Sequence, residues 1–305
     1  MITTMPPIRL FWWRPMTGTR RQKALDLRHL WTRRNDGRLL PPWALRNFGD
    51  ELAPSILRME LGETTAVRHS DAPAAEVFTL GSVLQRAALE AGEGTTVIGA
   101  GLPQLDSSDL LDRVRRGVHR LNLLAVRGPE TRKLLKLPQT TTLGDPALLL
   151  EGRLAPGDRK SGGVVVAHYS AKRNARTSGK LKSHAQRLNA RVVYTSDPLD
   201  DVLAAIGRAE WVLTSSLHGL VIADVMKTPA MPLARDANSP RDFRFDDYGG
   251  SVGRDVRATL LQRVSRADVL DASSWPRPEA IRVRDVADQL RSVTASWFAE
   301  RGGSS

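Results

Sequence analysis

The feature that most limits the fold of this chain is a repeated pattern of short apolar segments that end in glycine. Four such segments occur in the first half, at residues 77–80, 95–98, 123–126 and 140–143. Each is followed by glycine directly or after one residue, and Pro129 and Pro146 stand where a helix would begin. Strands that alternate with helices in this way form parallel sheets with right-handed crossovers. The pattern predicts an α/β protein with a doubly wound parallel sheet.

The same pattern resumes after residues 151–163, a stretch rich in glycine and charge. We interpret this stretch as a linker between an N-terminal domain, residues 1–152, and a C-terminal domain, residues 153–305. The second domain is predicted to contain strands at residues 164–167, 191–194, 211–213 and 228–234, the last near an edge, and helices at residues 180–188, 198–208 and 280–298. The buried side of the last helix is predicted to consist of Ile281, Val286, Leu290, Val293 and Trp297.

The N-terminal domain is predicted to begin with a strand at residues 8–13, followed by a partly helical segment at residues 22–31. Asn47 and Gly49 then predict a turn. Asp50 and Glu51 favour a helix start directly after it, because acidic side chains are stabilised near the positive end of a helix. Asp50 has an ordinary interpretation as a helix cap.

Composition excludes several classes of protein. The chain has 305 residues and no cysteine, which rules out disulfides, thiolate metal sites and a thiol nucleophile. It has no apolar run long enough to cross a membrane and no segment of signal-peptide type, so we expect a cytoplasmic protein. The formal net charge of +12 suits anionic ligands, nucleic acid or a charged membrane face. The basic residues form separate patches without a nucleic-acid-binding motif, so we do not expect a nucleic-acid partner.

The glycine turns of the first domain are predicted to share one edge of the sheet. Parallel α/β sheets bind ligands at the carboxyl ends of their strands, where Gly81, Ser82, Gly99 and Gly101 would lie. The third glycine of a dinucleotide fingerprint is missing after Gly101, which argues against a nicotinamide cofactor. Arg127 follows the third strand, and its guanidinium can hold a carboxylate or phosphate through two parallel hydrogen bonds. A surface arginine in a loop is the alternative.

The C-terminal domain carries its most distinctive turn at residues 211–229. An apolar strand ends at Thr214, Ser215 and Ser216, and a helix follows until Pro229. Free backbone N–H groups at such a helix start suit a carboxylate or phosphate. His218 lies in this turn beside Gly219 and is the first candidate for acid–base chemistry, and His168, at another strand end, is its rival. A structural histidine is the alternative interpretation of each.

Six motifs occur in a recognisable order along the chain. They are N-F-G-D-E-L at residues 47–52, G-S-V-L at 81–84, G-A-G at 99–101, R-G-P-E-T at 127–131, G-D-P-A-L-L at 144–149 and S-S-L-H-G-L at 215–220. Together they resemble the polysaccharide pyruvyl transferase family over about residues 47–248. The first 40 residues and the tail beyond about residue 250 carry little of the resemblance.

The resemblance implies two Rossmann-like domains arranged as in GT-B glycosyltransferases. It also implies transfer of pyruvate from phosphoenolpyruvate to two hydroxyls of a sugar, which forms a cyclic ketal without a metal or cofactor. His218 matches the family's catalytic histidine and Arg127 its donor-binding arginine, and Asp50 is expected to be an active-site acid. A protonated His218 would donate to the methylene carbon or to the leaving phosphate. The residues expected to line the binding site are Asn47, Gly49, Gly81, Ser82, Gly99, Gly101, His168, Ser215, Ser216, Leu217 and Gly219.

Two other functions remain open on the sequence. A GT-B glycosyltransferase with a nucleotide-sugar donor would share the architecture, and Arg127 would then bind a diphosphate. A basic nucleic-acid-binding protein would use the positive charge instead. On the pyruvyl transferase hypothesis the partners are phosphoenolpyruvate and a sugar acceptor in a polysaccharide, a glycolipid or a lipid-linked precursor, with peripheral attachment to the inner face of the membrane left open.

Overall fold

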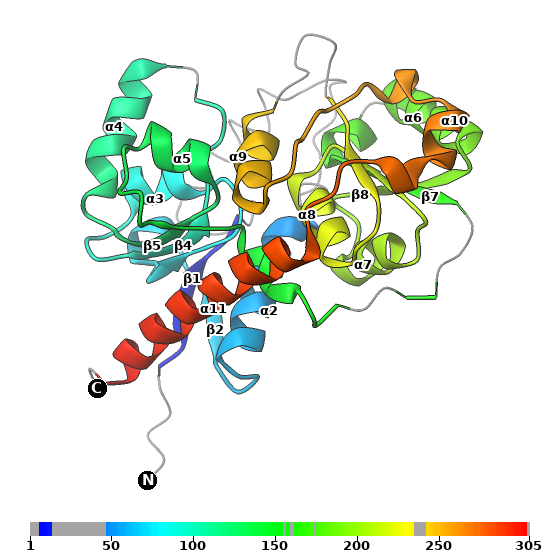
Figure 1. Cartoon of the computed structure of the whole chain (residues 1–305). Coiled ribbons are helices and arrows are strands. Elements are labelled where there is room, and N and C mark those ends of the chain that lie inside the picture. Colours follow the sequence, from blue (N-terminus) through cyan, green and yellow to red (C-terminus); the bar gives the residue numbers. More distant parts are fainter. Residues whose placement is uncertain are drawn as a thin grey trace.

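The protein has two sheets whose strands all run parallel, each sheet being flanked by helices (Figure 1). The computed structural model describes residues 6–13, 47–105, 107–154, 157–158, 162–173, 175–234 and 242–303. The helical segment expected at residues 22–31 lies outside these ranges. The α/β fold class with two parallel sheets is confirmed, and the arrangement is consistent with two Rossmann-like units of GT-B type.

The first sheet brings the four glycine-ended segments together as neighbours. Its strand order is β2-β1-β3-β4-β5-β6. The strands are β1 (Ile8–Phe11), β2 (Val67–His69), β3 (Val77–Phe78), β4 (Thr96–Ala100), β5 (Asn122–Val126) and β6 (Thr142–Leu143). The helices of this part are α2 (Phe48–Leu61), η2 (Ala72–Ala74), α3 (Leu84–Glu90), α4 (Ser108–Val118), α5 (Pro129–Leu134) and η3 (Pro146–Leu150). Because β3 to β6 are adjacent and parallel, their glycine turns lie at one edge, as predicted.

The second sheet has the order β10-β9-β7-β8, which places β10 at the edge as predicted. Its strands are β7 (Gly163–Ala167), β8 (Ala190–Tyr194), β9 (Val212–Thr214) and β10 (Ala230–Pro232). The helices between them are η4 (Tyr169–Arg173), α6 (Ala175–Arg187), α7 (Leu199–Gly207) and α8 (Leu217–Val225). The strand β9 and helix α8 form the predicted strand, turn and helix around His218.

The helix α2 begins earlier than predicted. Asn47 is its N-cap, with a side-chain oxygen that accepts the N–H of Gly49 at 3.2 Å, so Phe48 and Gly49 belong to the helix rather than to a turn. The Phe48 N–H donates to the carbonyl of Thr195, at the end of β8, at 2.8 Å. This bond fixes the start of α2, which belongs to the first part of the chain, against the second sheet.

The last part of the chain returns to the first sheet. Beyond β10 follow α9 (Phe243–Val252), η5 (Leu261–Arg263), α10 (Arg266–Leu270), η6 (Ala272–Ser274) and α11 (Ala280–Gly303). A Cβ on Gly144 would lie 2.6 Å from Val286 and 2.7 Å from Leu290 of α11, so this helix packs closely on the end of β6. Val286, Leu290 and Trp297 are buried as predicted and Val293 is partly buried, but Ile281 is 56% exposed, so its predicted burial was wrong. The domain boundary at residue 152 stays a prediction.

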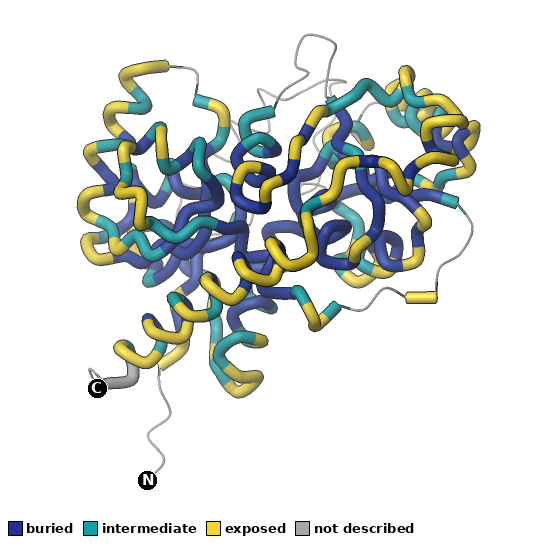
Figure 2. The backbone as a smooth tube through the Cα atoms, in the orientation of Figure 1, coloured by how far each residue is buried: buried dark blue, intermediate teal, exposed yellow. Residues whose placement is uncertain are grey.

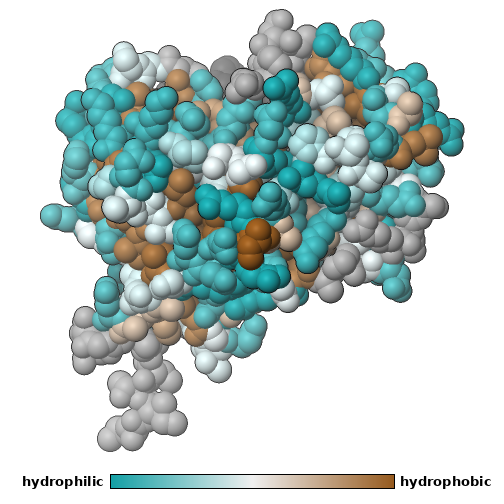
Figure 3. Space-filling model, viewed as in Figure 1, coloured by the Kyte–Doolittle hydropathy of each residue, from teal (hydrophilic) through white to brown (hydrophobic). Residues whose placement is uncertain are grey.

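The largest hydrophobic cluster joins the two sheets. It combines Ile8 and Leu10 of β1 with Val164 and Val166 of β7, together with buried side chains of α2, α8 and α11. Figure 2 shows this buried band running through the centre of the molecule. The face in Figure 3 is largely hydrophilic, with hydrophobic residues in small groups. In the described part of the chain, no helix has both the length and the apolar character needed to cross a membrane.

Candidate active site

His218 lies at the start of α8, where the second sheet faces the first. Ser216 is the N-cap of this helix and accepts the N–H of Gly219 at 3.4 Å. Gly219 is required here because a Cβ at this position would lie 2.4 Å from Oγ1 of Thr214. The turn therefore fixes the backbone of His218 tightly, and the side chain is buried, with 5% of the residue exposed.

Three residues of the first part of the chain surround the ring of His218. A Cβ on Gly49 would lie 1.8 Å from Nδ1, so the backbone of α2 packs directly on the ring. A Cβ on Gly81, which follows β3, would lie 3.3 Å from Oδ1 of Asp50 and 3.9 Å from Cε1 of His218. Asp50 and His218 therefore face the same glycine. The structure brings together Gly49, Asp50, Gly81 and His218, all of which were expected in the site.

The sequence interpretation missed Asp145, whose carboxyl group lies close to the imidazole of His218. It follows β6 and caps η3, with Oδ1 accepting the N–H of Ala147 at 3.0 Å. Its other oxygen, Oδ2, lies 3.9 Å from Nε2 of His218. Both atoms are buried, and neither has a hydrogen-bond partner among the residues that the structure describes. A carboxylate and an imidazole thus face each other across the junction of the two sheets.

Arg127 lies at the same junction, but its guanidinium is enclosed by protein groups. Nε donates to Oδ2 of Asp247 at 3.0 Å, one terminal nitrogen donates to Oγ of Ser82 at 3.1 Å, and the other donates to the carbonyl of Leu102 at 2.8 Å. A Cβ on Gly101 would lie 2.2 Å from Cζ of Arg127. Gly101 and Ser82, both expected to bind substrate, therefore contact the arginine.

Burial and nearby charge change the proton affinities of the site. Burial, followed by the positive charges of Arg127 and Arg244, lowers the pKa of His218 to about 3. Burial raises the pKa of Asp50 to about 7 and that of Asp145 to about 6. Burial therefore favours a neutral imidazole at pH 7, and it favours the protonated form of Asp50 to a far higher pH than that of an exposed carboxyl. The protonated His218 expected from the sequence is therefore not the state that this environment favours.

Arg244 is the second cation of this region, and the sequence interpretation did not single it out. It lies on α9, two residues after the N-cap Asp242, and its Nε donates to Oδ1 of Asp242 at 2.9 Å. About a fifth of its side chain is exposed, in contrast to the fully buried Arg127. A terminal nitrogen of Arg244 also donates to Oδ2 of Asp242 at 2.6 Å, so an anionic ligand that binds this partly exposed guanidinium has to share it with Asp242.

The remaining predicted site residues have structural contacts of their own. Ser215 accepts the backbone N–H of His168 at 3.0 Å, and Nδ1 of His168 lies 2.8 Å from Oγ of Ser170. Leu217 is buried in the core beside His218. Gly99 adopts a φ of 73° and approaches Pro146 so closely that a Cβ would lie 2.6 Å from its ring. The role of each of these residues in binding stays a prediction.

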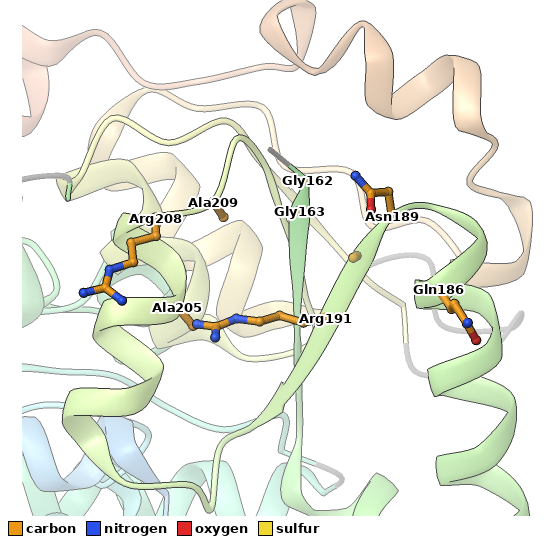
Figure 4. Close-up of a pocket in the computed structure, with 9 residues that line it drawn as sticks. Gly162, Gly163, Gln186, Asn189, Arg191, Ala205, Arg208 and Ala209 are labelled. Atoms are coloured by element: carbon orange, nitrogen blue, oxygen red, sulfur yellow. The ribbon is translucent and has the colours of Figure 1, made fainter. Parts of the chain in front are cut away.

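A cavity of about 380 Å³ lies at the end of the second sheet where its strands begin, opposite the end that carries His218. It is lined by Gly163 and Arg191, at the starts of β7 and β8, and by Ala205 and Arg208 of the region where α7 ends (Figure 4). The side chain of Arg191 reaches from β8 toward Ala205. His218 follows the end of β9, which runs parallel to β7, so the length of the sheet separates this cavity from the candidate site.

Comparison with known proteins agrees with the motifs around this site. The polysaccharide pyruvyl transferase family matches residues 47–237, which include Asp50, Arg127, Asp145 and His218. The chain belongs to the polysaccharide pyruvyl transferase family. It is also similar to the succinoglycan biosynthesis protein ExoV of Rhizobium meliloti (strain 1021), with 22% identity over 255 residues that cover 80% of this chain and 77% of ExoV. Both comparisons support a pyruvyl transferase of polysaccharide biosynthesis.

The family match ends before α9, yet α9 supplies Arg244 and the partner of Arg127. None of the six motifs named in the sequence lies in α9. Asp145 belongs to the G-D-P-A-L-L motif. Its position just after a predicted strand, at the end of the sheet where ligands bind, was the signal that could have identified it as a site residue. Arg244 and Asp247 follow no such strand and had no equivalent signal.

Proposed function

We propose that the protein transfers pyruvate from phosphoenolpyruvate to two hydroxyls of a sugar in a polysaccharide, glycolipid or lipid-linked precursor, forming a cyclic ketal and releasing phosphate. The observation that supports this most directly is the grouping of one imidazole and two carboxyls, His218, Asp50 and Asp145, with the cations Arg127 and Arg244. Pyruvyl transfer from this donor requires both kinds of group, because protons move and the donor is strongly anionic.

The proton requirements of the reaction match the pKa values of the site. The methylene carbon of the donor takes up one proton and becomes the methyl group of the ketal. Asp50, with a pKa raised to about 7, is suited to supply that proton near neutral pH. The ring of His218 is neutral, so it can accept a proton from an attacking hydroxyl, although a pKa of about 3 makes it a weak base that needs a nearby carboxylate to stabilise the imidazolium. We therefore assign the acid role to Asp50 and the base role to His218.

The cations at the site suit the charge of the donor. Phosphoenolpyruvate carries a phosphate and a carboxylate, and Arg244 is partly exposed near His218. The guanidinium of Arg127 is buried and held by Asp247. We therefore infer that Arg127 contributes mainly positive potential to the site and keeps the residues around it in place. The N–H groups at the start of α8 add further positive potential for an anionic oxygen.

Donor choice separates this function from the glycosyltransferase alternative. The purified protein is incubated with candidate sugar acceptors and either phosphoenolpyruvate or UDP- and GDP-sugars, and released phosphate or nucleotide is measured. We expect acceptor-dependent phosphate release from phosphoenolpyruvate alone. Release of nucleotide from a sugar nucleotide, without phosphate from phosphoenolpyruvate, would favour the glycosyltransferase. Tight, steeply salt-dependent binding to DNA or RNA without either reaction would favour the nucleic-acid alternative.

A further inference from the structure

The side chains of His218 and Asp145 face each other, and each has a buried polar atom on the facing side. Oδ2 of Asp145 and Nε2 of His218 lie 3.9 Å apart, which is too far for a direct hydrogen bond. Both are buried without a hydrogen-bond partner in the described part of the chain. Buried polar atoms are nearly always hydrogen-bonded, and two such exceptions pointing at one gap indicate a place for a third polar group.

The packing of the imidazole determines which of its nitrogens can react. Nδ1 lies against the backbone of α2, where even a Cβ on Gly49 would approach it to 1.8 Å. A substrate atom therefore has no room on that side. Nε2 faces the gap, and any hydroxyl that gives its proton to Nε2 has to enter the space shared with Asp145. Chemistry at His218 thus brings the substrate into contact with Asp145 as well.

The separation of the two atoms suits a bridging hydroxyl. An oxygen that lies about 2.8 Å from each atom, to one side of the line that joins them, can bridge them at normal hydrogen-bond length. A hydroxyl has one donor and two acceptor positions, so it bridges the pair when one of the two atoms carries a proton: it accepts from that atom and donates to the other. Once Nε2 has taken up a proton, an ionised Asp145 would stabilise the imidazolium and so oppose the effect of burial on the ring.

We propose that Asp145 is a catalytic residue whose carboxyl group, together with Nε2 of His218, binds and deprotonates a hydroxyl of the sugar acceptor. This proposal rests on the proposed function. After Asp50 has protonated the methylene carbon, the O–H bond of the acceptor breaks, its oxygen forms a bond to C2 of the donor, and the proton passes to Nε2 beside Asp145. The bond between C2 and the phosphate oxygen then breaks, and this proton leaves with the phosphate. The oxygen of the second hydroxyl bonds to C2 and closes the ketal, and its proton restores Asp50.

The structure also indicates what access requires. His218 is 5% exposed and Asp145 is fully buried, so an acceptor reaches the gap only when the elements around it separate. Those elements belong to both sheets, with α2, β3 and η3 on one side and α8 on the other. The titratable or charged groups that face Asp145 are His218 from α8, Arg127 directly after β5, and Asp247 and Tyr248 from α9.

The test uses Asp145→Asn in the full-length protein. Asparagine is nearly the same size and can still accept the N–H of Ala147, so the cap of η3 is kept. We expect kcat to fall by at least about 100-fold, with a donor Kd, measured by calorimetry, within about threefold of wild type. The limb of the wild-type pH–rate profile that reports the His218 and Asp145 pair should disappear. Unchanged kcat and an unchanged profile would overturn the proposal.

Two further measurements keep the test decisive. The matched control is Asp268→Asn, which removes an exposed capping carboxylate from α10, far from the site, and should leave kcat unchanged. If Asp145→Asn does not fold, wild-type protein labelled with ¹⁵N-histidine provides the answer, because ionisation of Asp145 should shift the Nε2 signal of His218 near pH 6. If the Nε2 signal does not respond to the ionisation of Asp145 at any pH at which the protein stays folded, the proposal is overturned. Wild-type protein that is inactive with every acceptor would refute the proposed function instead.

Discussion

Arg127 and Asp247 form a fully buried ion pair, with 3.0 Å between Nε and Oδ2, although 120 residues separate them along the chain. Asp247 also accepts the N–H and the hydroxyl of Thr131, at 2.8 Å and 2.6 Å. The next residue, Tyr248, donates to Asp224 of α8 at 2.9 Å. Two consecutive residues of α9 thus connect the strand end that carries Arg127 with the helix that carries His218.

This connection predicts that Asp247 is essential for the fold as well as for the site. Asp247→Ala leaves the guanidinium of Arg127 buried without its carboxylate, and we expect the free energy of unfolding to fall by about 3–5 kcal/mol. Denaturation in urea measures it. The control is Asp255→Ala, which breaks an exposed pair with Arg257 and should leave the unfolding midpoint unchanged within error. Equal midpoints for both variants would contradict this role of Asp247.

Gly49 provides a test of the histidine position that leaves the helix intact. In Gly49→Ala the new Cβ would overlap Nδ1 of His218, so the ring has to move, and we expect kcat to fall by at least about 100-fold. Gly179→Ala is the matched control, because it lies in α6 with no atom within 4 Å of the added Cβ. It should retain wild-type kcat. Steady-state kinetics on both folded variants checks the prediction, and a fully active Gly49→Ala would show that the ring position is unimportant.

The return of α11 to the first sheet predicts a contrast along one helix. Leu290→Ala removes a fully buried side chain that packs against Gly144, and we expect a loss of about 2–5 kcal/mol in the free energy of unfolding. Ile281→Ala changes an exposed side chain of the same helix and should have little effect. Thermal or urea denaturation measures both. Similar losses at the two positions would contradict the packing of α11 described above.

Asp50 predicts a characteristic dependence of stability on pH. Its pKa is raised in the folded protein to about 7, so the native state holds a proton that the unfolded chain has already released above about pH 4. Its contribution to stability is therefore present below about pH 4 and is lost as the pH rises through about 7. Relative to wild type, Asp50→Asn should gain about 2–4 kcal/mol between pH 4 and pH 8. A constant difference in unfolding free energy across this range would contradict the raised pKa.

The local patterns of the sequence were sufficient for the fold class and for much of the site. Strands that end in glycine, and prolines that begin helices, depend on nearest neighbours, so β3 to β6 and the turn around His218 were predicted close to their observed bounds. Asn47 shows the limit of this reasoning, because the same residue types are common in turns and at helix caps. In the structure Asn47 is a helix cap, and the next residue, Phe48, donates its N–H to Thr195 of the second part of the chain.

The contacts that complete the site depend on long-range packing, which local patterns do not encode. Asp145 and His218 come from different sheets, and Asp145 alone has the ordinary role of a cap. Asp247 meets Arg127 only because α9 packs against α5 after the chain has completed the second sheet. Ile281 fits the apolar pattern of α11, yet it remains exposed. Helical periodicity identifies the apolar face of a helix, but it does not show which turns of that face are covered by the rest of the molecule.

The transfer of pyruvate to a sugar is tested most directly by mass spectrometry of candidate acceptors after incubation with phosphoenolpyruvate, comparing wild type with His218→Ala. We expect wild type to add the mass of one pyruvate less one water to an acceptor, with one phosphate released for each. Folded His218→Ala should do so at least about 100-fold more slowly. An acceptor modified at the same rate by both proteins would contradict the role of His218, and the addition of a sugar residue in place of pyruvate would contradict the proposed reaction.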